Sequence, residues 1–157
     1  MNPPVRIDAQ IEVNAPPATV FAAATDWDRQ GEWMLGTTVR VRRGDGHSVG
    51  SELEAVTGIG GIGVADHMRI TVWDAPSRCE MRHLGPVVRG IGIFAVRPRG
   101  DDAATFEWTE QLELPLGVLG RVGWPLVRPL FGWGLRFSLA RFAAFCRTYP
   151  DTSPIRD

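Results

Sequence analysis

The sequence contains no lysine, because all 17 of its basic residues are arginine. This absence excludes Schiff-base catalysis, which needs a lysine amine, and phosphate-binding loops that depend on a lysine. Cysteine is scarce as well, with only Cys79 and Cys146, far apart in the chain. Two distant cysteines exclude a disulfide framework and a cysteine-rich zinc site, and we expect both thiols to be buried.

Long hydrophobic runs are also missing. A membrane-spanning helix needs roughly 18 consecutive apolar residues, and no such run occurs. The chain does not open with a basic stretch followed by an apolar one, so we expect no signal peptide and a cytoplasmic protein. With 157 residues, 44% of them hydrophobic and 22% charged, the composition is typical of one globular domain. We expect a single domain over residues 1–157, with its core at about 5–149 and a short flexible tail at 150–157.

Charge is distributed unevenly along the chain. Its formal net charge is −1, yet between Leu114 and Pro150 there are five arginines and no acidic residue. A nucleic-acid-binding protein typically has a basic surface interleaved with aromatic residues over much of its area, so we expect no nucleic-acid partner. The three histidines are scattered and match no metal-ligand spacing, and we expect neither a metal nor another cofactor.

Alternation of apolar and polar residues predicts a β-sheet. The segment from Val5 to Val13 alternates throughout and is typical of a strand with one buried face. Six further strands follow at short, turn-rich intervals, which favours an antiparallel meander. The predicted strands are Val5–Val13, Val39–Arg43, Ser51–Thr57, Ala65–Asp74, Arg78–Leu84, Val88–Arg97 and Ala104–Leu114.

Helical patterns occur after the first strand and at the end of the chain. Two short helices are predicted at Ala18–Thr25 and Asp28–Met34. A long helix is predicted from about Leu130 to Thr148, because Pro125 and Pro129 should start, kink or interrupt any helix there. Its apolar stripe, which we expect to pack on the sheet, is Phe131, Leu135, Ser138, Phe142 and Phe145. The fold class is therefore α+β, a helix-grip arrangement in which a curved antiparallel sheet of about seven strands wraps around the C-terminal helix.

One glycine-rich segment matches a known ligand-binding pattern by chance. Gly58-Ile-Gly-Gly-Ile-Gly63 fits the G-x-G-x-x-G pattern of dinucleotide-binding sites. Those sites also require a helix directly after the glycines, whose N-terminus binds phosphate. Because a strand is predicted there instead, we interpret the segment as a hairpin connection.

Several motifs resemble the opening and the turns of one superfamily. The segment Ile11-Glu-Val-Asn-Ala-Pro-Pro-Ala-Thr-Val-Phe21, followed by Asp26-Trp27 and Trp33, resembles the start of START-like (SRPBCC) domains in the polyketide cyclase/dehydrase and lipid-transport branch. Trp73-Asp-Ala-Pro-Ser-Arg78 and Leu114-Pro-Leu-Gly-Val-Leu119 resemble a later turn and the entry to the last helix of that branch. The resemblance implies a cavity between sheet and helix for hydrophobic ligands. It implies no particular reaction, because the superfamily shares no catalytic residues.

Strand alternation assigns the residues that should face this cavity. The predicted lining is Leu53, Met68, Ile70, Met81, Phe94, Trp108, Leu112, Phe131, Leu135 and Phe142. His67 and Arg69, which follow Asp66, alternate with the lining row and should point outward, so a catalytic role for them is not favoured.

Two titratable residues interrupt the inward rows. Glu110 lies in the apolar row of the last strand, and His83 is in register with Met81. A buried carboxylate is costly unless it is paired or protonated, so these residues are the candidate catalytic or ligand-orienting pair. We expect them roughly 10 Å apart across one intervening strand, with a ligand between them. The alternative is that each is a satisfied core group, with Glu110 paired to an arginine.

Three functional hypotheses follow. The leading one is a carrier or sensor that binds a hydrophobic small molecule, such as a lipid, polyketide or quinone-like compound, as a monomer or homodimer. The second is an aromatase, cyclase or dehydratase that uses Glu110 and His83 for proton transfer. The third, less favoured, is a peripheral-membrane or interaction module that uses the arginines, Trp133 and Phe137 of the C-terminal segment.

Overall fold

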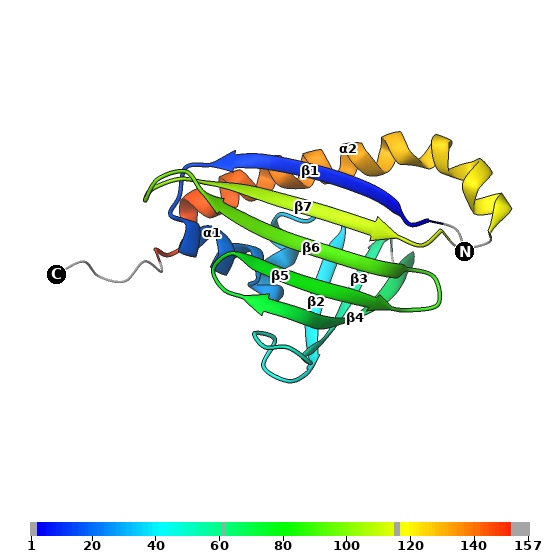
Figure 1. Ribbon diagram of the computed structural model, residues 1–157, viewed down its shortest axis with the longest axis horizontal. Coiled ribbons are helices and arrows are strands. Elements are labelled where there is room, and N and C mark those ends of the chain that lie inside the picture. The colour runs from blue at the N-terminus through cyan, green and yellow to red at the C-terminus, as the bar shows by residue number, and fades with distance from the viewer. Residues whose placement is uncertain (1–2, 61, 115–116, 152–157) are drawn as a thin grey trace.

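The computed structural model describes residues 3–60, 62–114 and 117–151 (Figure 1). Seven strands form one antiparallel sheet in the order β1-β7-β6-β5-β4-β3-β2. The strands are β1 Val5–Val13, β2 Thr37–Arg43, β3 Glu52–Ile59, β4 Ile62–Asp74, β5 Arg78–Leu84, β6 Arg89–Pro98 and β7 Ala104–Leu112. The helices are α1 Pro17–Ala24, the 3-10 helix η1 Trp27–Glu32 and α2 Val118–Thr148. This architecture confirms the predicted helix-grip α+β fold. The predicted tail lies outside the described residues from residue 152 onward.

The sheet curves, and α2 lies along its inner face. In Figure 1, α2 runs behind β1 and β7, while α1 and η1 lie at the end where α2 finishes. Two hydrogen bonds tie α2 to η1 and the segment after it: the Leu35 amide donates to Ser138 Oγ at 3.0 Å, and Arg141 donates to the Glu32 carbonyl at 2.8 Å. The glycine-rich segment connects β3 to β4 and no helix follows it, as predicted. Gly61 lies outside the described residues.

Helix α2 begins earlier than expected. It starts at Val118 and contains Pro125 and Pro129 in its interior, where a start near Leu130 was predicted. A proline removes one amide donor and crowds the carbonyl four residues before it, so it bends a helix more readily than it ends it. Figure 1 shows the yellow first part of α2 bending away from the line of the rest. Among the described residues, no helix combines the length and hydropathy of a membrane span, α2 included.

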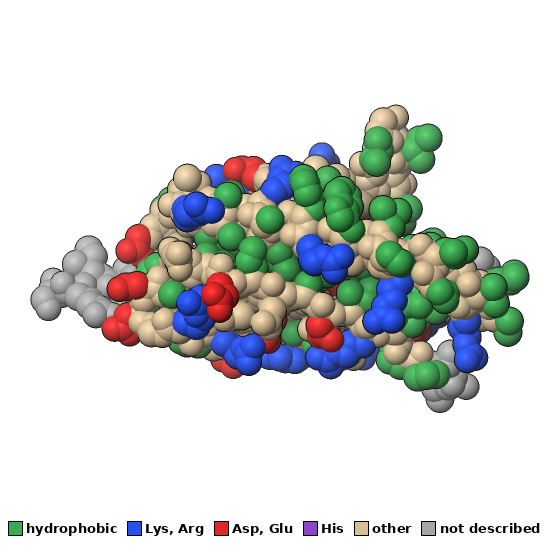
Figure 2. Space-filling model, turned by 90° about the horizontal axis from the view of Figure 1, so that it is seen from above, with side chains coloured by type: hydrophobic (Ala, Val, Ile, Leu, Met, Phe, Trp, Pro, Cys, Tyr) green, Lys and Arg blue, Asp and Glu red, His purple; other side chains and the backbone are tan. Residues whose placement is uncertain are grey.

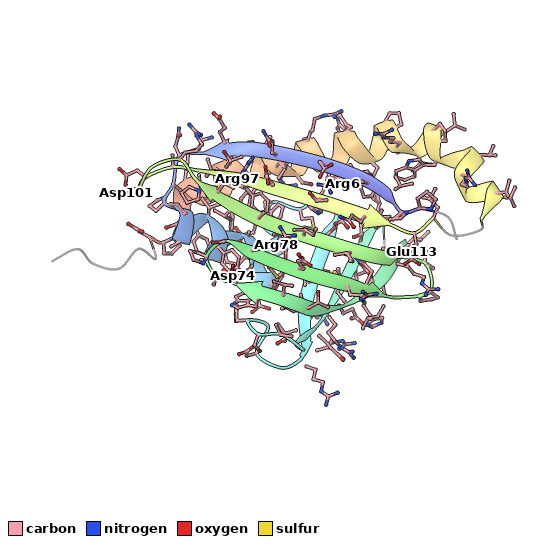
Figure 3. The ribbon with its side chains drawn as sticks, in the orientation of Figure 1. Arg6, Asp74, Arg78, Arg97, Asp101 and Glu113 are labelled. Carbon is pink, nitrogen blue, oxygen red and sulfur yellow. The ribbon has the colours of Figure 1, made fainter. Side chains whose placement is uncertain are left out.

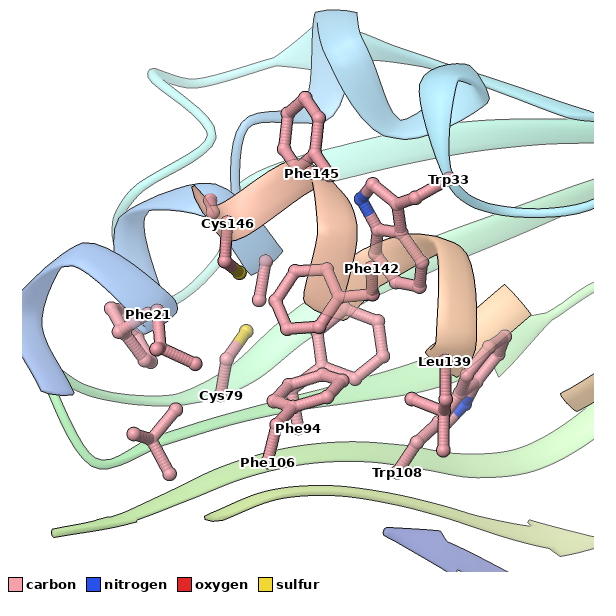
Figure 4. Close-up of a cluster of buried hydrophobic side chains, with 14 of the residues drawn as sticks. Phe21, Trp33, Cys79, Phe94, Phe106, Trp108, Leu139, Phe142, Phe145 and Cys146 are labelled. Atoms are coloured by element: carbon pink, nitrogen blue, oxygen red, sulfur yellow. The ribbon is translucent and has the colours of Figure 1, made fainter. Parts of the chain in front are cut away.

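An aromatic cluster holds α2 on the sheet (Figure 4). Phe142 of α2 lies 4.5 Å from Phe106 of β7 and 4.7 Å from Trp33, measured between ring centroids. Phe94 of β6 joins the cluster at 5.4 Å from Phe106. All four rings are almost completely buried, and aromatic pairs at these distances add stability beyond the area that they bury.

The outer face of the sheet carries ion pairs between exposed or half-buried side chains. Arg6 pairs with Asp8 at 2.8 Å and Arg78 with Glu80 at 2.6 Å, and Figure 3 shows Arg6 and Arg78 on the face turned away from α2. Such surface pairs each contribute roughly 0–1 kcal/mol. The stability of the fold therefore depends on the inner face.

We predict that Phe142→Ala lowers the free energy of unfolding by about 3–5 kcal/mol, because it opens a void inside the aromatic cluster. Phe137→Ala is the matched control, since Phe137 lies on the same helix and is 41% exposed. It should cost less than about 1 kcal/mol. Chemical denaturation of both variants measures the difference, and equal losses would contradict this account of the core.

Candidate functional site

A cavity of about 390 Å³ lies between the inner face of the sheet and α2. On α2, its wall consists of Phe131, Gly134, Leu135 and Ser138. Phe142 and Phe145 fill the space above the sheet, whereas Ser138 and Gly134 leave room one to two turns earlier. The cavity therefore lies beside the aromatic cluster, toward the beginning of α2.

Seven of the ten residues predicted to line the cavity are in its wall: Met68, Met81, Phe94, Trp108, Leu112, Phe131 and Leu135. Leu53, Ile70 and Phe142 lie instead in the packed core beside it and are at most 1% exposed. Alternation indicates which face of a strand is buried, but it does not tell whether the space over that face is filled. At Phe142 the neighbouring aromatic rings fill it.

The wall also contains residues from η1 and the segment leading into β2, which alternation could not assign. These are Trp27, Gln30, Met34 and Leu35, followed by Thr37 and Val39 of β2.

A hydrogen-bonded chain of three titratable side chains crosses the sheet side of the cavity. His83 of β5 lies between two carboxylates, with Nδ1 2.6 Å from Asp66 Oδ2 and Nε2 3.1 Å from Glu110 Oε2. Trp108 Nε1 donates to the other Glu110 oxygen at 2.7 Å. His83 is 9% exposed and Glu110 8%, and Asp66 is partly buried. The cluster is thus an ion pair network held largely out of water.

The prediction that His83 and Glu110 lie roughly 10 Å apart is wrong. Their strands are separated by β6, as predicted, but the two side chains meet over Gly92. A Cβ at Gly92 would lie 3.3 Å from Glu110 Oε1 and 3.4 Å from His83 Nε2. Such a Cβ would crowd both side chains. Because they are hydrogen-bonded directly to each other, no ligand lies between the pair. The partner of Glu110 is a histidine rather than an arginine.

Asp66 is the member of the site that sequence reasoning missed. It lies two residues before Met68 in β4, so the same alternation that places Met68 inward also places Asp66 inward. Its neighbours behave as predicted: His67 is 3.5 Å from Glu54 and Arg69 is 2.7 Å from Glu52 on the outer face. The alternation along β4 therefore indicated that Asp66 points inward. It was missed because Asp66 was grouped with His67 and Arg69, which point outward.

The two carboxylates control the charge of His83. Burial lowers the pKa of the imidazole, but hydrogen bonds and charge attraction from Asp66 and Glu110 outweigh it and raise the pKa to about 10. At neutral pH the ring is therefore an imidazolium that donates to both carboxylates. No group of side chains among the described residues is arranged to hold a metal.

We predict that the His83 ring titrates with a pKa near 10 instead of near the ordinary histidine value of 6.5. Since the folded-state pKa is the higher one, the stabilising contribution of His83 is complete below about pH 6.5 and is lost as the pH rises toward 10. NMR titration of the ring measures the midpoint. Asp66→Asn removes one counter-charge and should lower that midpoint, whereas a wild-type midpoint at or below 6.5 would contradict the ion-paired arrangement.

Comparison with known proteins gives the family of the chain. Residues 4–146 match the model of the family described as polyketide cyclase / dehydrase and lipid transport. No curated protein sequence matches the chain.

Solved structures show the same fold at low identity. A protein from Thermus thermophilus is 18% identical with a TM-score of 0.76, over 91% of this chain and 97% of that one. A START superfamily protein from Mycobacterium smegmatis is 20% identical with a TM-score of 0.70, over 90% and 95%. The Zhui aromatase/cyclase from a Streptomyces species is 12% identical with a TM-score of 0.74, over 91% and 93%. With the family match covering most of its length, the chain belongs to the polyketide cyclase/dehydrase and lipid transport family.

Proposed function

We propose that the protein binds an uncharged hydrophobic small molecule, such as a lipid, polyketide or quinone-like compound, in the cavity between the sheet and α2. The cavity itself carries this proposal. Its volume of about 390 Å³ lies within the roughly 300–1,000 Å³ typical of small-molecule sites. Its wall is mainly apolar, with one polar cluster that would orient the ligand. The family, which includes lipid transport, supports a carrier or sensor role.

The charges of the wall argue against an anionic ligand. Among the described residues that line the cavity there is no arginine, and both nitrogens of His83 already face carboxylates. One imidazolium between two carboxylates leaves an excess of negative charge. A carboxylate or phosphate entering this space would lose its hydration without gaining a cation, which is costly.

Two unpartnered acceptors favour a ligand that donates hydrogen bonds. Asp66 Oδ1 and Gln30 Oε1 are buried and have no hydrogen-bond partner, and both residues belong to the cavity wall. Buried polar atoms are nearly always paired in proteins. A hydroxyl or N–H group of a ligand would supply the missing donor after a small side-chain shift.

We predict that naphthol binds at least about tenfold more tightly than naphthoate, its anionic analogue. Asp66→Asn removes a negative charge from the wall and should reduce this preference. The matched control is Glu54→Gln, which makes the same change on the outer face of the sheet. Fluorescence titration measures the affinities. Equal affinities would contradict the charge argument, and failure of both probes and of related apolar compounds to bind would contradict the proposed function.

A second function is favoured by the Asp66–His83–Glu110 chain, which is a path for proton transfer in an aromatase, cyclase or dehydratase. The raised pKa of His83, about 10, weakens this case. An acid works best when its pKa lies near the working pH, and an imidazolium held this firmly is a poor donor at neutral pH. We therefore rank binding above catalysis.

Glu110→Gln separates the two functions. Under the binding function, the wild type does not turn over a linear poly-β-ketone, and the substitution changes only affinity or selectivity. Under the enzymatic function, the substitution abolishes turnover and leaves the Kd nearly unchanged. We expect the first outcome, and product analysis combined with a binding titration on both proteins measures it.

A further inference from the structure

Helix α2 has a second apolar stripe that faces solvent. We call it the outer stripe: Leu119, Val122, Leu126, Leu130, Trp133 and Phe137, which are 74%, 70%, 83%, 69%, 51% and 41% exposed. Their spacing of three or four residues places them on one side of the helix. The buried stripe from Phe131 to Phe145 occupies the opposite side. A surface helix normally has one apolar face, so a second one of this length is typical of an interaction site.

The charge around the outer stripe is of one sign. The helix carries arginines and no acidic residue between Val118 and Thr148, and Arg136, beside the outer stripe, is exposed. The acid nearest to its start in the sequence, Glu113, lies 3.6 Å from Arg89. Figure 2 shows hydrophobic and arginine side chains over the end of the molecule where α2 begins, whereas acidic side chains are most frequent toward the opposite end.

Other exposed apolar residues lie at the same end of the sheet. The loop from β5 to β6 presents Val87, and the hairpin from β3 to β4 presents Ile59 and Ile62, which are 55%, 90% and 84% exposed. Val87 borders the same surface hollow as Trp124 and Val127 of α2. The cavity residue Val64 is 48% exposed in this hairpin. These side chains add exposed apolar surface at the end of the sheet where α2 begins, close to a residue of the cavity wall.

We propose that the outer stripe docks on the surface of an anionic phospholipid membrane. Apolar side chains on one helix face enter the boundary between headgroups and acyl chains, while arginines pair with phosphates. Trp133 suits this boundary because its ring is apolar and its N–H is polar. A second copy of the chain fits less well, because it would bring the arginines of two helices together. The proposal does not depend on the ligand of the cavity.

Vesicle sedimentation tests the docking. The protein should sediment at low salt with vesicles of equal parts phosphatidylcholine and phosphatidylglycerol, and much less with pure phosphatidylcholine or at high salt. The double variant Leu126→Ser/Leu130→Ser should bind at least about tenfold more weakly. Arg136→Gln should also weaken binding, by about fivefold, and reduce its salt dependence.

Val49→Ser is the matched control, since Val49 is 64% exposed but lies in the loop between β2 and β3. It should bind as the wild type does, and all variants should unfold at the wild-type temperature because the changes are on the surface. The proposal is overturned if the wild type does not sediment with the anionic vesicles at low salt, or if the leucine variant binds normally. It is equally overturned if the outer stripe proves to be covered by a second copy, seen as a lipid-free dimer that the leucine variant abolishes.

Discussion

The contact of Phe142 with Phe106 and Trp33 is the interaction on which the rest of the structure depends. It fixes the C-terminal half of α2 against β7 and the segment after η1. Because these rings fill the space at one end, the smaller residues Ser138 and Gly134 cannot close the space at the other. A well-packed interior has few voids larger than a water molecule. A cavity of about 390 Å³ in a chain of this size is therefore a consequence of how large and small residues are distributed along one helix face.

The charged side chains of Asp66, His83 and Glu110 in the cavity wall need a separate explanation. Holding an imidazolium and two carboxylates largely out of water gives little net stability, because their desolvation offsets their attraction. The pair also crosses β6 at Gly92, where a side chain would crowd both groups, and a glycine inside a strand weakens it. An apolar triad would serve a purely structural role at least as well. The polar cluster, together with the unpartnered Asp66 Oδ1, is consistent with recognition of a ligand.

Sequence reasoning predicted the fold well and the site incompletely, for identifiable reasons. The bounds of β1 and β5 agree residue by residue, because strict alternation and turn residues are local signals. The start of α2 was missed because proline bends a helix without necessarily ending it. The distance between His83 and Glu110 was overestimated because strand spacing gives the separation of backbones. To predict that these two long side chains meet over Gly92, one would need to know the register of β5, β6 and β7.

The two apolar sides of α2 connect the cavity to the surface. The inner side lines the cavity through Phe131 and Leu135, and the outer side exposes Leu130 and Trp133, so neighbouring residues serve different environments. Packing alone accounts for the inner side. The first part of α2 extends past the aromatic cluster, contains both prolines and is mostly exposed. The part of α2 that lines the cavity begins at Phe131, directly after Leu130 of the outer stripe. Ligand binding in the cavity and docking of the outer stripe therefore depend on neighbouring parts of one helix.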